Sequence, residues 1–302
     1  MSNQEYRSGV VAIIGPPNAG KSTLLNYLLG QKITIVSSKP QTTRNRILGI
    51  VSGEGYQMIM LDTPGLHNAR DMLNKEMMRV ALDSLSEADV VLVIDDSSVT
   101  TPSLLEKRKA EYQEYFSLIR VPTLLVLNKV DLIEPQKLLP LTEKYMELHT
   151  FAAALPISAL QGDGVDGLVR EVIALLPEGP QYYPDDIPTD ASERFIVSEI
   201  IREKVFILTR DEVPYSTAVV IDQFAEGNGR GPIIIHATIV VERGSQKGII
   251  IGHRGAMLGK IRTQATRDVE HLLGCKVRLK LWVKVRKNWT GNEHLLREFG
   301  LT

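Results

Sequence analysis

Eight residues close to the N-terminus have the types and the spacing of a phosphate-binding loop. They are Gly15-Pro16-Pro17-Asn18-Ala19-Gly20-Lys21-Ser22, between an apolar run that ends at Ile14 and a helical pattern that begins at Thr23. Glycine at both ends lets backbone N–H groups turn toward one centre, and the helix N-terminus adds a dipole that favours anions. Lys21 can reach β- and γ-phosphates, and the Ser22 hydroxyl can ligate Mg²⁺. The pattern predicts a nucleotide phosphate site.

A second motif, Asp62-Thr63-Pro64-Gly65, follows the apolar run 56–61. A carboxylate at the end of such a strand holds Mg²⁺ through the water shell of the ion, and the Gly65 N–H can contact a γ-phosphate. This motif predicts the metal side of a nucleoside triphosphate site.

A third motif, Asn128-Lys129-Val130-Asp131, follows a later apolar run. The Asp131 carboxylate can accept hydrogen bonds from N1–H and the 2-amino group of guanine. Adenine has no donor at either position and would leave the carboxylate unpaired, which costs a few kcal/mol. We expect Asn128 to tie this loop to the phosphate loop and the Lys129 stem to cover one face of the base. With the Ser158-Ala159 backbone near guanine O6, the motif predicts a guanine nucleotide.

Apolar runs alternate with helical patterns through this part of the chain. Strands are predicted at 10–14, 46–51, 56–61, 90–94, 123–127 and 155–157, and helices at 23–29, 71–86, 103–119 and 165–176. The alternation predicts an α/β fold: a mainly parallel six-stranded sheet, covered on both faces, with the site at the carboxyl ends of the strands. The turn 52–55 makes a hairpin, which implies one antiparallel edge strand.

Prolines accumulate between the two halves of the chain, at positions 177, 180, 184 and 188. They exclude regular helix and stiffen the backbone. We predict a first domain at 1–180, a proline-rich linker at 181–192 and a second domain at 193–302. The overall charge of −1 hides a difference between the halves, because the 13 basic and 4 acidic residues from Arg243 onward give this end a net charge of +9. Such an end is typical of a polyanion-binding surface, or of a solvated face.

Composition narrows the class of protein. The sequence has no run of 18 apolar residues, and its polar first residues are not those of a signal peptide. Cys275 is the only cysteine, which excludes an internal disulfide, a cysteine zinc site and an iron–sulfur cluster. We expect Cys275 to be a small buried core residue and the protein to work in a reducing cytoplasm.

The second half combines a glycine-flanked loop with a specific order of elements. A helix is predicted from 193 to about 209, strands at 215–224 and 233–242, a short helix from 245, the loop Ile251-Gly252-His253-Arg254-Gly255, a helix from 256 and a strand at 276–285. This order resembles a type II KH domain, in which nucleic-acid backbone approaches the glycine loop and unstacked bases lie in an apolar groove. The expected RNA contacts are Ile251, Met257 and Ile261 in the groove, Arg254, Lys260 and Arg262 at phosphates, and Gly252, His253 and Gly255 in the loop.

The motifs of the first half, in their order, resemble those of translation-factor-class GTPases. The resemblance implies GTP hydrolysis with Mg²⁺, a switch I loop in which Thr42 or Thr43 ligates the metal beside Ser22 and Asp62, and a switch II loop that begins at Asp62. It implies catalytic roles for Lys21, Ser22, Thr43, Gly65 and Asn18. The implied GTP contacts are Gly15, Pro16, Pro17, Asn18, Ala19, Gly20, Lys21, Ser22, Thr23, Asp62, Thr63, Pro64, Gly65, Leu66, Asn128, Lys129, Val130, Asp131, Ser158 and Ala159.

One position departs from the pattern of Ras-like GTPases. Leu66 stands where those proteins have the glutamine that orients the attacking water, so intrinsic hydrolysis is expected to be slow. His67 could replace that glutamine by acting as a general base toward the water. Asn18 offers a second route to faster hydrolysis, because in similar bacterial GTPases an asparagine at this position can ligate K⁺ beside the phosphates. The alternative is that Asn18 only caps the loop.

The two halves together resemble bacterial ribosome-associated GTPases. This resemblance implies a monomeric GTP/GDP switch that binds 16S ribosomal RNA near its 3′ end and acts in assembly of the small ribosomal subunit. The alternative is a GTP-dependent regulator that uses the basic C-terminal region at the inner membrane. An RNA-modifying enzyme would need a second catalytic site, and we find no candidate motif for one.

Overall fold

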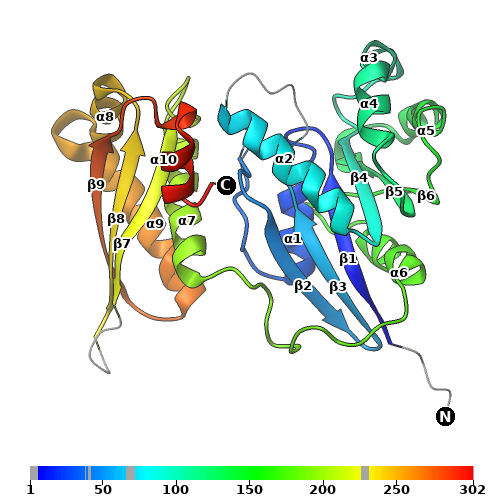
Figure 1. Ribbon diagram of the computed structural model, residues 1–302, viewed down its shortest axis with the longest axis horizontal. Helices are drawn as coiled ribbons and strands as arrows, with labels where there is room; N and C mark the ends of the chain where they lie inside the picture. Colours follow the sequence, from blue (N-terminus) through cyan, green and yellow to red (C-terminus); the bar gives the residue numbers. More distant parts are fainter. Residues whose placement is uncertain (1–5, 38, 40–41, 66–71, 226–230, 302) are drawn as a thin grey trace. The chain divides into compact units, whose positions relative to one another are not determined.

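The structure is a computed structural model that describes residues 6–37, 39, 42–65, 72–225 and 231–301 (Figure 1). The chain divides into two compact units. The first consists of Met1–Ile33, Thr43–His67 and Met77–Asp190, and the second of Thr34–Thr42, Asn68–Glu76 and Ala191–Thr302. Each unit has its own sheet.

The first unit is built on a six-stranded sheet. Its strands are β1 (Arg7–Ile14), β2 (Ile47–Gly53), β3 (Tyr56–Asp62), β4 (Val90–Asp96), β5 (Thr123–Asn128) and β6 (Ala153–Pro156). Their order is β2-β3-β1-β4-β5-β6, and β2 alone pairs in an antiparallel manner. Every residue of β4 and β5 is buried, as expected for central strands covered on both faces. The predicted α/β fold with one antiparallel edge strand is confirmed.

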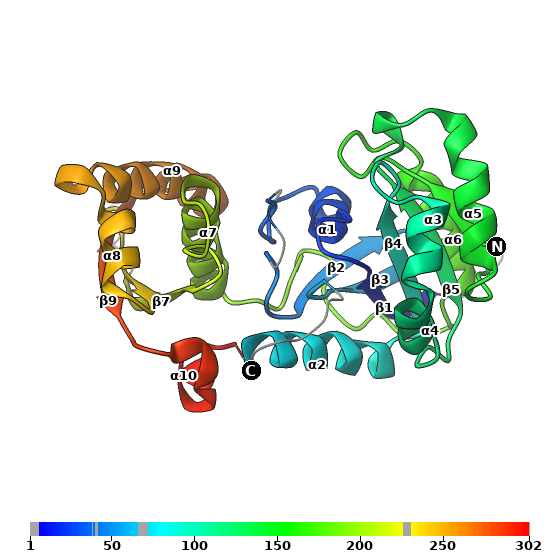
Figure 2. The ribbon, with the colours of Figure 1, turned by 90° about the horizontal axis from the view of Figure 1, so that it is seen from above.

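Helices pack two apolar clusters against the two faces of this sheet. They are α1 (Lys21–Leu29), α2 (Met72–Glu87), α3 (Pro102–Lys107), α4 (Lys109–Phe116), α5 (Leu138–Met146) and α6 (Val165–Leu175). One cluster includes Leu24 of α1 and Leu168 of α6, and the other includes Leu105, Tyr112 and Tyr145 of α3, α4 and α5. Figure 2 shows α1 and α2 on opposite sides of β1 and β3.

The single helix predicted at 103–119 is wrong, because two helices meet at Arg108. Its backbone has φ −103° and ψ 9°, outside the helical region. The Arg108 guanidinium instead bonds both oxygens of Glu111, at 3.0 and 3.1 Å, and lies 5.2 Å from the centre of the Tyr112 ring. Helical periodicity alone gave no sign of this break.

Strand register brings the predicted motifs to one edge of the sheet. Ile13 of β1 lies beside Asp62, and Asp96 of β4 lies beside Asn128. Leu127 in turn lies beside Pro156, two residues before Ser158. Because parallel strands share a direction, the loops after β1, β3, β4, β5 and β6 all leave from their carboxyl ends.

The proline-rich segment that follows α6 is fastened to strands β2 and β3. The Gln57 carboxamide oxygen accepts from the N–H groups of Tyr182 and Tyr183, at 2.9 and 3.0 Å. Farther along, the Thr189 hydroxyl donates to the Leu48 carbonyl at 2.5 Å, and the Ile50 N–H donates to a proline carbonyl at position 188. The proline-rich stretch is thus bound to the first unit up to Asp190.

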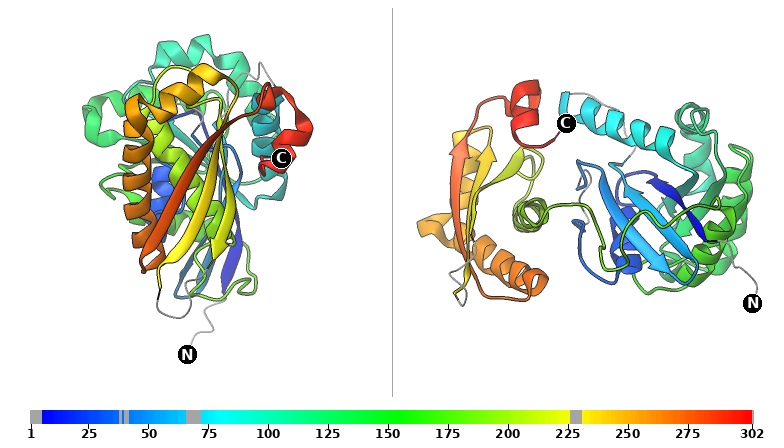
Figure 3. Two further views of the ribbon diagram at one scale, coloured as in Figure 1. Left: turned by 90° about the vertical axis from the view of Figure 1, so that its left-hand side faces the viewer. Right: turned by 60° about the horizontal axis from the view of Figure 1, so that its bottom comes forward.

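The second unit consists mainly of helices packed on a three-stranded sheet. Its elements are α7 (Glu193–Leu208), β7 (Thr217–Ala225), β8 (Ile233–Val241), α8 (Gly244–Ile251), η3 (His253–Gly255), α9 (Ala256–Leu273), β9 (Val277–Val285), η4 (Trp289–Gly291) and α10 (Glu293–Glu298). Strand β8 is central, antiparallel to β7 and parallel to β9. The left view of Figure 3 shows the sheet in front of α7 and α9.

One residue of the second unit shows how the C-terminal segment packs, and two others correct expectations. Trp289 is fully buried and its indole N–H donates to the Ser216 carbonyl at 3.1 Å, so the C-terminal segment packs on its own unit there. Cys275 is exposed, contrary to expectation, because it lies in the turn after Gly274, which ends α9 with φ 64°. Ile261 is fully buried in α9, which contradicts the expectation that its side chain lines an open groove.

Candidate functional site

The loop after β1 is shaped by two glycines that no other residue could replace. Gly15 has φ 152°, and a Cβ there would lie 2.0 Å from the Ile94 carbonyl oxygen. Gly20 has φ 102°, and a Cβ there would lie 2.1 Å from the amide nitrogen of Asn128. The backbone thus approaches the neighbouring strands more closely than a side chain allows. The two glycines let the loop curl around a centre at the N-terminus of α1.

Lys21 is the cation of this loop. Its ammonium donates to the carbonyls of Gly15 and Pro16, at 3.1 and 2.9 Å, and the side chain is buried. Burial lowers the pKa of Lys21 to about 8, and the charges of Asp62 and Asp95 oppose that shift. An ammonium held this way is ready to exchange carbonyls for phosphate oxygens.

Nucleotide binding is expected to weaken as the pH rises above about 8. In the nucleotide-free chain the pKa of Lys21 is lowered to about 8, so the ammonium is lost above that pH. Bound phosphate stabilises the ammonium and raises its pKa, so GDP affinity should fall by about tenfold per pH unit until the bound pKa is reached. Calorimetric titration from about pH 7 to pH 9.5 measures this. Lys21→Arg, which stays charged, should give a flat profile, and a flat profile for the native chain would contradict the assignment.

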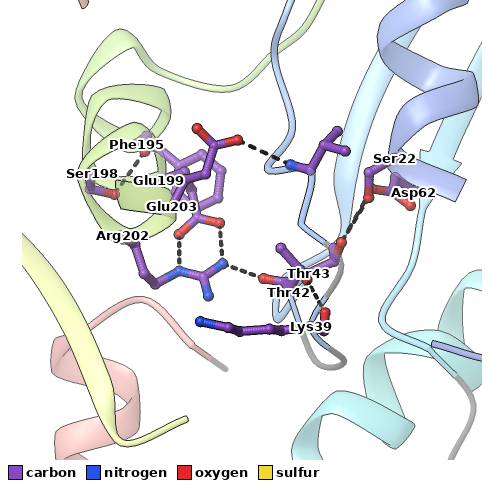
Figure 4. A network of polar contacts seen from close by, with 11 residues as sticks. Ser22, Lys39, Thr42, Thr43, Asp62, Phe195, Ser198, Glu199, Arg202 and Glu203 are labelled. Atoms are coloured by element: carbon purple, nitrogen blue, oxygen red, sulfur yellow. Dashed lines mark hydrogen bonds and ion pairs between the residues drawn. The ribbon is translucent and has the colours of Figure 1, made fainter. Parts of the chain in front are cut away.

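Three oxygen-bearing side chains converge beside Lys21. The Ser22 hydroxyl donates to Asp62 Oδ2 at 2.6 Å, and the Thr43 hydroxyl lies 3.0 Å from Ser22 Oγ and 3.4 Å from the same carboxylate oxygen (Figure 4). The other carboxylate oxygen, Oδ1, is buried and has no hydrogen-bond partner within the described residues. Burial raises the pKa of Asp62 to about 6, while the Ser22 hydrogen bond and the Lys21 charge oppose the shift.

This arrangement fits a small hard cation. A carboxylate and two hydroxyls are oxygen ligands of the kind that Mg²⁺ binds, and the unsatisfied Asp62 oxygen would gain a partner. A cation would also offset the cost of burying the Asp62 charge.

The two threonines of the switch I loop face different partners. The Thr43 hydroxyl points to Ser22, whereas the Thr42 hydroxyl donates to the Lys39 carbonyl at 2.8 Å. Of the two alternatives that the sequence leaves open, the geometry favours Thr43 as the metal ligand.

The loop after Asp62 approaches the phosphate loop. A Cβ on Gly65 would lie 2.8 Å from the Pro17 backbone nitrogen, so only glycine allows this approach. The Thr63 hydroxyl is buried and donates to the Ile13 carbonyl at 2.7 Å, which fixes the start of the loop. Leu66 and His67, to which the sequence assigns roles in hydrolysis, lie outside the described residues.

Asn128 joins three loops. Its amide nitrogen donates to the Ala19 carbonyl at 2.7 Å, and its amide oxygen accepts from the Ala159 N–H at 2.9 Å. The side chain is buried, so both ends must be paired. The expected tie between the base-reading loop and the phosphate loop is present.

Lys129 is half-buried and Asp131 is exposed beside Asn128, whereas Ser158 and Ala159 are buried. Asp131 is exposed, and its carboxylate has no ion pair or hydrogen bond in the described part of the chain. Lys129 has a left-handed backbone, φ 63°, and its ammonium pairs with Asp96 Oδ2 at 2.5 Å. Asp96 is a site residue that the sequence reasoning missed, although an acidic residue at the end of β4 was the available signal.

The glycine loop of the second unit joins two helices. Gly252 (φ 70°), Arg254 (φ 51°) and Gly255 (φ 79°) all have positive φ. The side chains of His253, Arg254, Lys260 and Arg262 are exposed, and Ile251 and Met257 are half-buried. The loop therefore presents backbone and cationic side chains to solvent, as binding of a nucleic-acid backbone requires.

Fold and site together define the class: a P-loop GTPase domain followed by a KH domain. Residues 10–129 match the family described as 50S ribosome-binding GTPase, and residues 212–290 match the KH domain family. The chain belongs to the GTPase Era family, and it is a GTP-hydrolysing enzyme. No helix among the described residues combines the length and apolar character needed to cross a membrane.

Relatives and solved structures match the chain over nearly its whole length. GTPase Era of Geobacter metallireducens is 52% identical over 305 residues, which cover 100% of both chains. GTPase Era of Geobacter sp. strain M21 is 51% identical over 300 residues, 99% of each. A crystal structure of Era with MgGDPNP and nucleotides 1506–1542 of 16S ribosomal RNA is 40% identical, covers 98% of this chain and 99% of that chain, and has a TM-score of 0.93. An Aquifex aeolicus Era variant with GDP and AlF₄⁻ is 39% identical, with 98% and 99% coverage and a TM-score of 0.92.

Proposed function

We propose that this chain is a GTP-dependent switch that binds 16S ribosomal RNA near its 3′ end during assembly of the small ribosomal subunit in the cytoplasm. The observation that carries the proposal is the full-length likeness to Era bound to MgGDPNP and 16S ribosomal RNA nucleotides. The exposed cations of the glycine loop and the net basic C-terminal end support it.

Each site residue has a proposed role. Lys21, Ser22, Thr43 and Asp62 would hold Mg²⁺ and the phosphates, and Mg²⁺ would neutralise charge that develops on the phosphates. Guanine would be selected by Asn128, Lys129, Asp131 and Ala159, and RNA would be bound by Ile251–Gly255. We propose a GTPase domain at 1–180, a linker at 181–192 and a KH domain at 193–302.

The test is whether the nucleotide changes RNA affinity. Titration calorimetry of the full chain with an oligonucleotide of the 16S 3′ end should give different affinities in the empty, GDP and GTP-analogue states. A coupling free energy between the two sites makes RNA affinity depend on the nucleotide that is bound. Equal affinities in all three states would show two independent domains on one chain.

We propose that K⁺ assists hydrolysis through Asn18. Asn18 is exposed and has a left-handed backbone, φ 64°, at the rim of the phosphate loop. Replacing Na⁺ by K⁺ should raise the hydrolysis rate by at least about tenfold, because a cation beside the phosphates acts as an arginine finger does. Asn18→Gly keeps this backbone conformation but removes the amide, and should abolish the difference. Equal rates of the native chain in the two salts would leave Asn18 as a cap of the loop.

Monomeric state and peripheral contact with the inner membrane are further proposals. The basic C-terminal end could face anionic lipid instead of RNA. Anionic vesicles and the RNA oligonucleotide should compete for the chain if one surface serves both. Vesicle binding that persists at saturating RNA would favour a separate membrane role.

A further inference from the structure

The chain passes from one unit to the other at the residue next to the metal site. Thr34–Thr42 belongs to the second unit, and the first unit resumes at Thr43. The peptide bond between Thr42 and Thr43 is therefore the boundary. A contact that fixes the Thr42 carbonyl also restrains the backbone position of Thr43, because a planar peptide bond joins the two residues.

Arg202 of α7 holds that carbonyl. Its Nη2 donates to the Thr42 carbonyl oxygen, and the same guanidinium donates to both carboxylate oxygens of Glu199, at 2.7 and 2.6 Å (Figure 4). The guanidinium carbon lies 5.2 Å from the centre of the Phe206 ring. Arg202 is only 2% exposed. Because Glu199 and Phe206 hold the planar guanidinium, the second N–H of Nη2 points in a set direction, which a flexible surface cation does not provide.

Two more contacts fasten the same segment to α7. The Val36 N–H donates to Glu203 Oε1 at 3.2 Å. The Lys39 ammonium donates to the carbonyls of Phe206 and Thr209 at the C-terminal end of α7, where carbonyls lack helical partners and a cation is favoured. The segment is held at three points along its length.

The carboxylate that holds Val36 is itself fixed. Glu203 is 1% exposed, and the Lys204 ammonium contacts Glu203 Oε2 at 2.7 Å and the carboxylate of Asp268. Asp268 lies on α9, the helix that follows the glycine loop. These charges of α7 are buried and paired, so they form a rigid support for the segment.

We infer that Arg202 is a positioning residue for GTP hydrolysis, which acts through Thr42 on Thr43. The inference rests on the proposed role of Thr43 and deepens the proposed switch, because it assigns a residue of the KH domain to the GTPase reaction. Removing the guanidinium leaves the Thr42 carbonyl without this donor and loosens Thr43. The contacts of the phosphate loop and of the base-reading loop stay in place. Hydrolysis should therefore slow while nucleotide binding persists.

The experiment compares variants of the full-length chain. Arg202→Met should lower kcat by about tenfold, because small misplacement of a positioned group is costly, while the KM for GTP stays within about twofold. Arg202→Lys, which keeps one donor, should restore part of the rate. Thr43→Ala is the reference for loss of the metal ligand. Val197→Ala, a buried apolar change on the same helix, controls for simple destabilisation.

A second readout does not depend on activity. In the nucleotide-free chain, hydrogen–deuterium exchange of the peptide that contains Val36 should speed up in Arg202→Met and not in Val197→Ala. Unchanged kcat and exchange in Arg202→Met, with a slow Thr43→Ala, would overturn the inference alone. Equal changes in Val197→Ala would also overturn it, because they would reflect general destabilisation. If Thr43→Ala also keeps its native rate, the proposed role of Thr43 fails and the inference fails with it.

Discussion

Asp131→Asn is expected to change the base preference of the chain from guanine to xanthine. The exposed Asp131 carboxylate has no partner among the described residues, so it is free to accept from guanine N1–H and the 2-amino group. The NH₂ group of asparagine would face the 2-amino group of guanine, and two donors cannot form a hydrogen bond. GDP affinity should therefore fall by about 10³-fold or more. Xanthine carries an oxygen at that position and would accept the new donor. Competition between GDP and xanthosine diphosphate measures the change.

Glu134→Gln is the matched control for this experiment. Glu134 is an exposed carboxylate three positions farther along the chain, and its side chain forms an ion pair with Lys137 at 3.7 Å. This variant should keep the native preference. Undiminished GDP selectivity in Asp131→Asn would show that another residue reads the base.

Gly255→Asp is expected to lower RNA affinity by at least about 100-fold without changing nucleotide affinity. Gly255 has φ 79°, and a Cβ there meets no atom within 4 Å. Aspartate tolerates this left-handed backbone better than most residues, so the added carboxylate should fit and repel the RNA phosphates. Oligonucleotide binding and GDP binding are measured on the same sample.

The neutral isostere separates charge from shape at this position. Gly255→Asn makes the same backbone demand without the charge, so it should retain much more RNA affinity than the aspartate variant. Gly252 is a poorer choice, because a Cβ there would lie 2.7 Å from the Met257 Cβ and would distort the loop. Equal losses in both Gly255 variants would mean that the loop fails for steric reasons, and loss of GDP binding as well would mean a folding defect.

The nucleotide motifs were predictable because each is short and local. Gly15 to Ser22 span the loop after β1 and the first two residues of α1, and the physical demand on each residue type can be stated without the rest of the chain. The edge to which these motifs converge was also predictable, because parallel strands place their following loops on one side. The tie from Asn128 to the phosphate loop was anticipated for the same reason.

Residues whose role depends on burial were predicted less well. Cys275 was expected inside and is exposed, whereas Ile261 was expected at a surface groove and is fully buried. Periodicity shows which positions share a helix face, but not which face the neighbouring elements cover. Arg108 interrupts a predicted helix through its backbone dihedrals, φ −103° and ψ 9°, which periodicity does not reveal.

The sequence by itself determined the chemistry of this protein: a guanine nucleotide site with a magnesium ligand set, followed by a glycine-loop RNA-binding domain. Only the tertiary structure decided that Thr43 and not Thr42 faces Asp62, and that Arg202 and Glu203 are buried supports and not a solvated helix face. The physical reason is distance along the chain. Arg202 and Thr42 are 160 residues apart, and a contact across such a separation leaves no local pattern in the residues that make it.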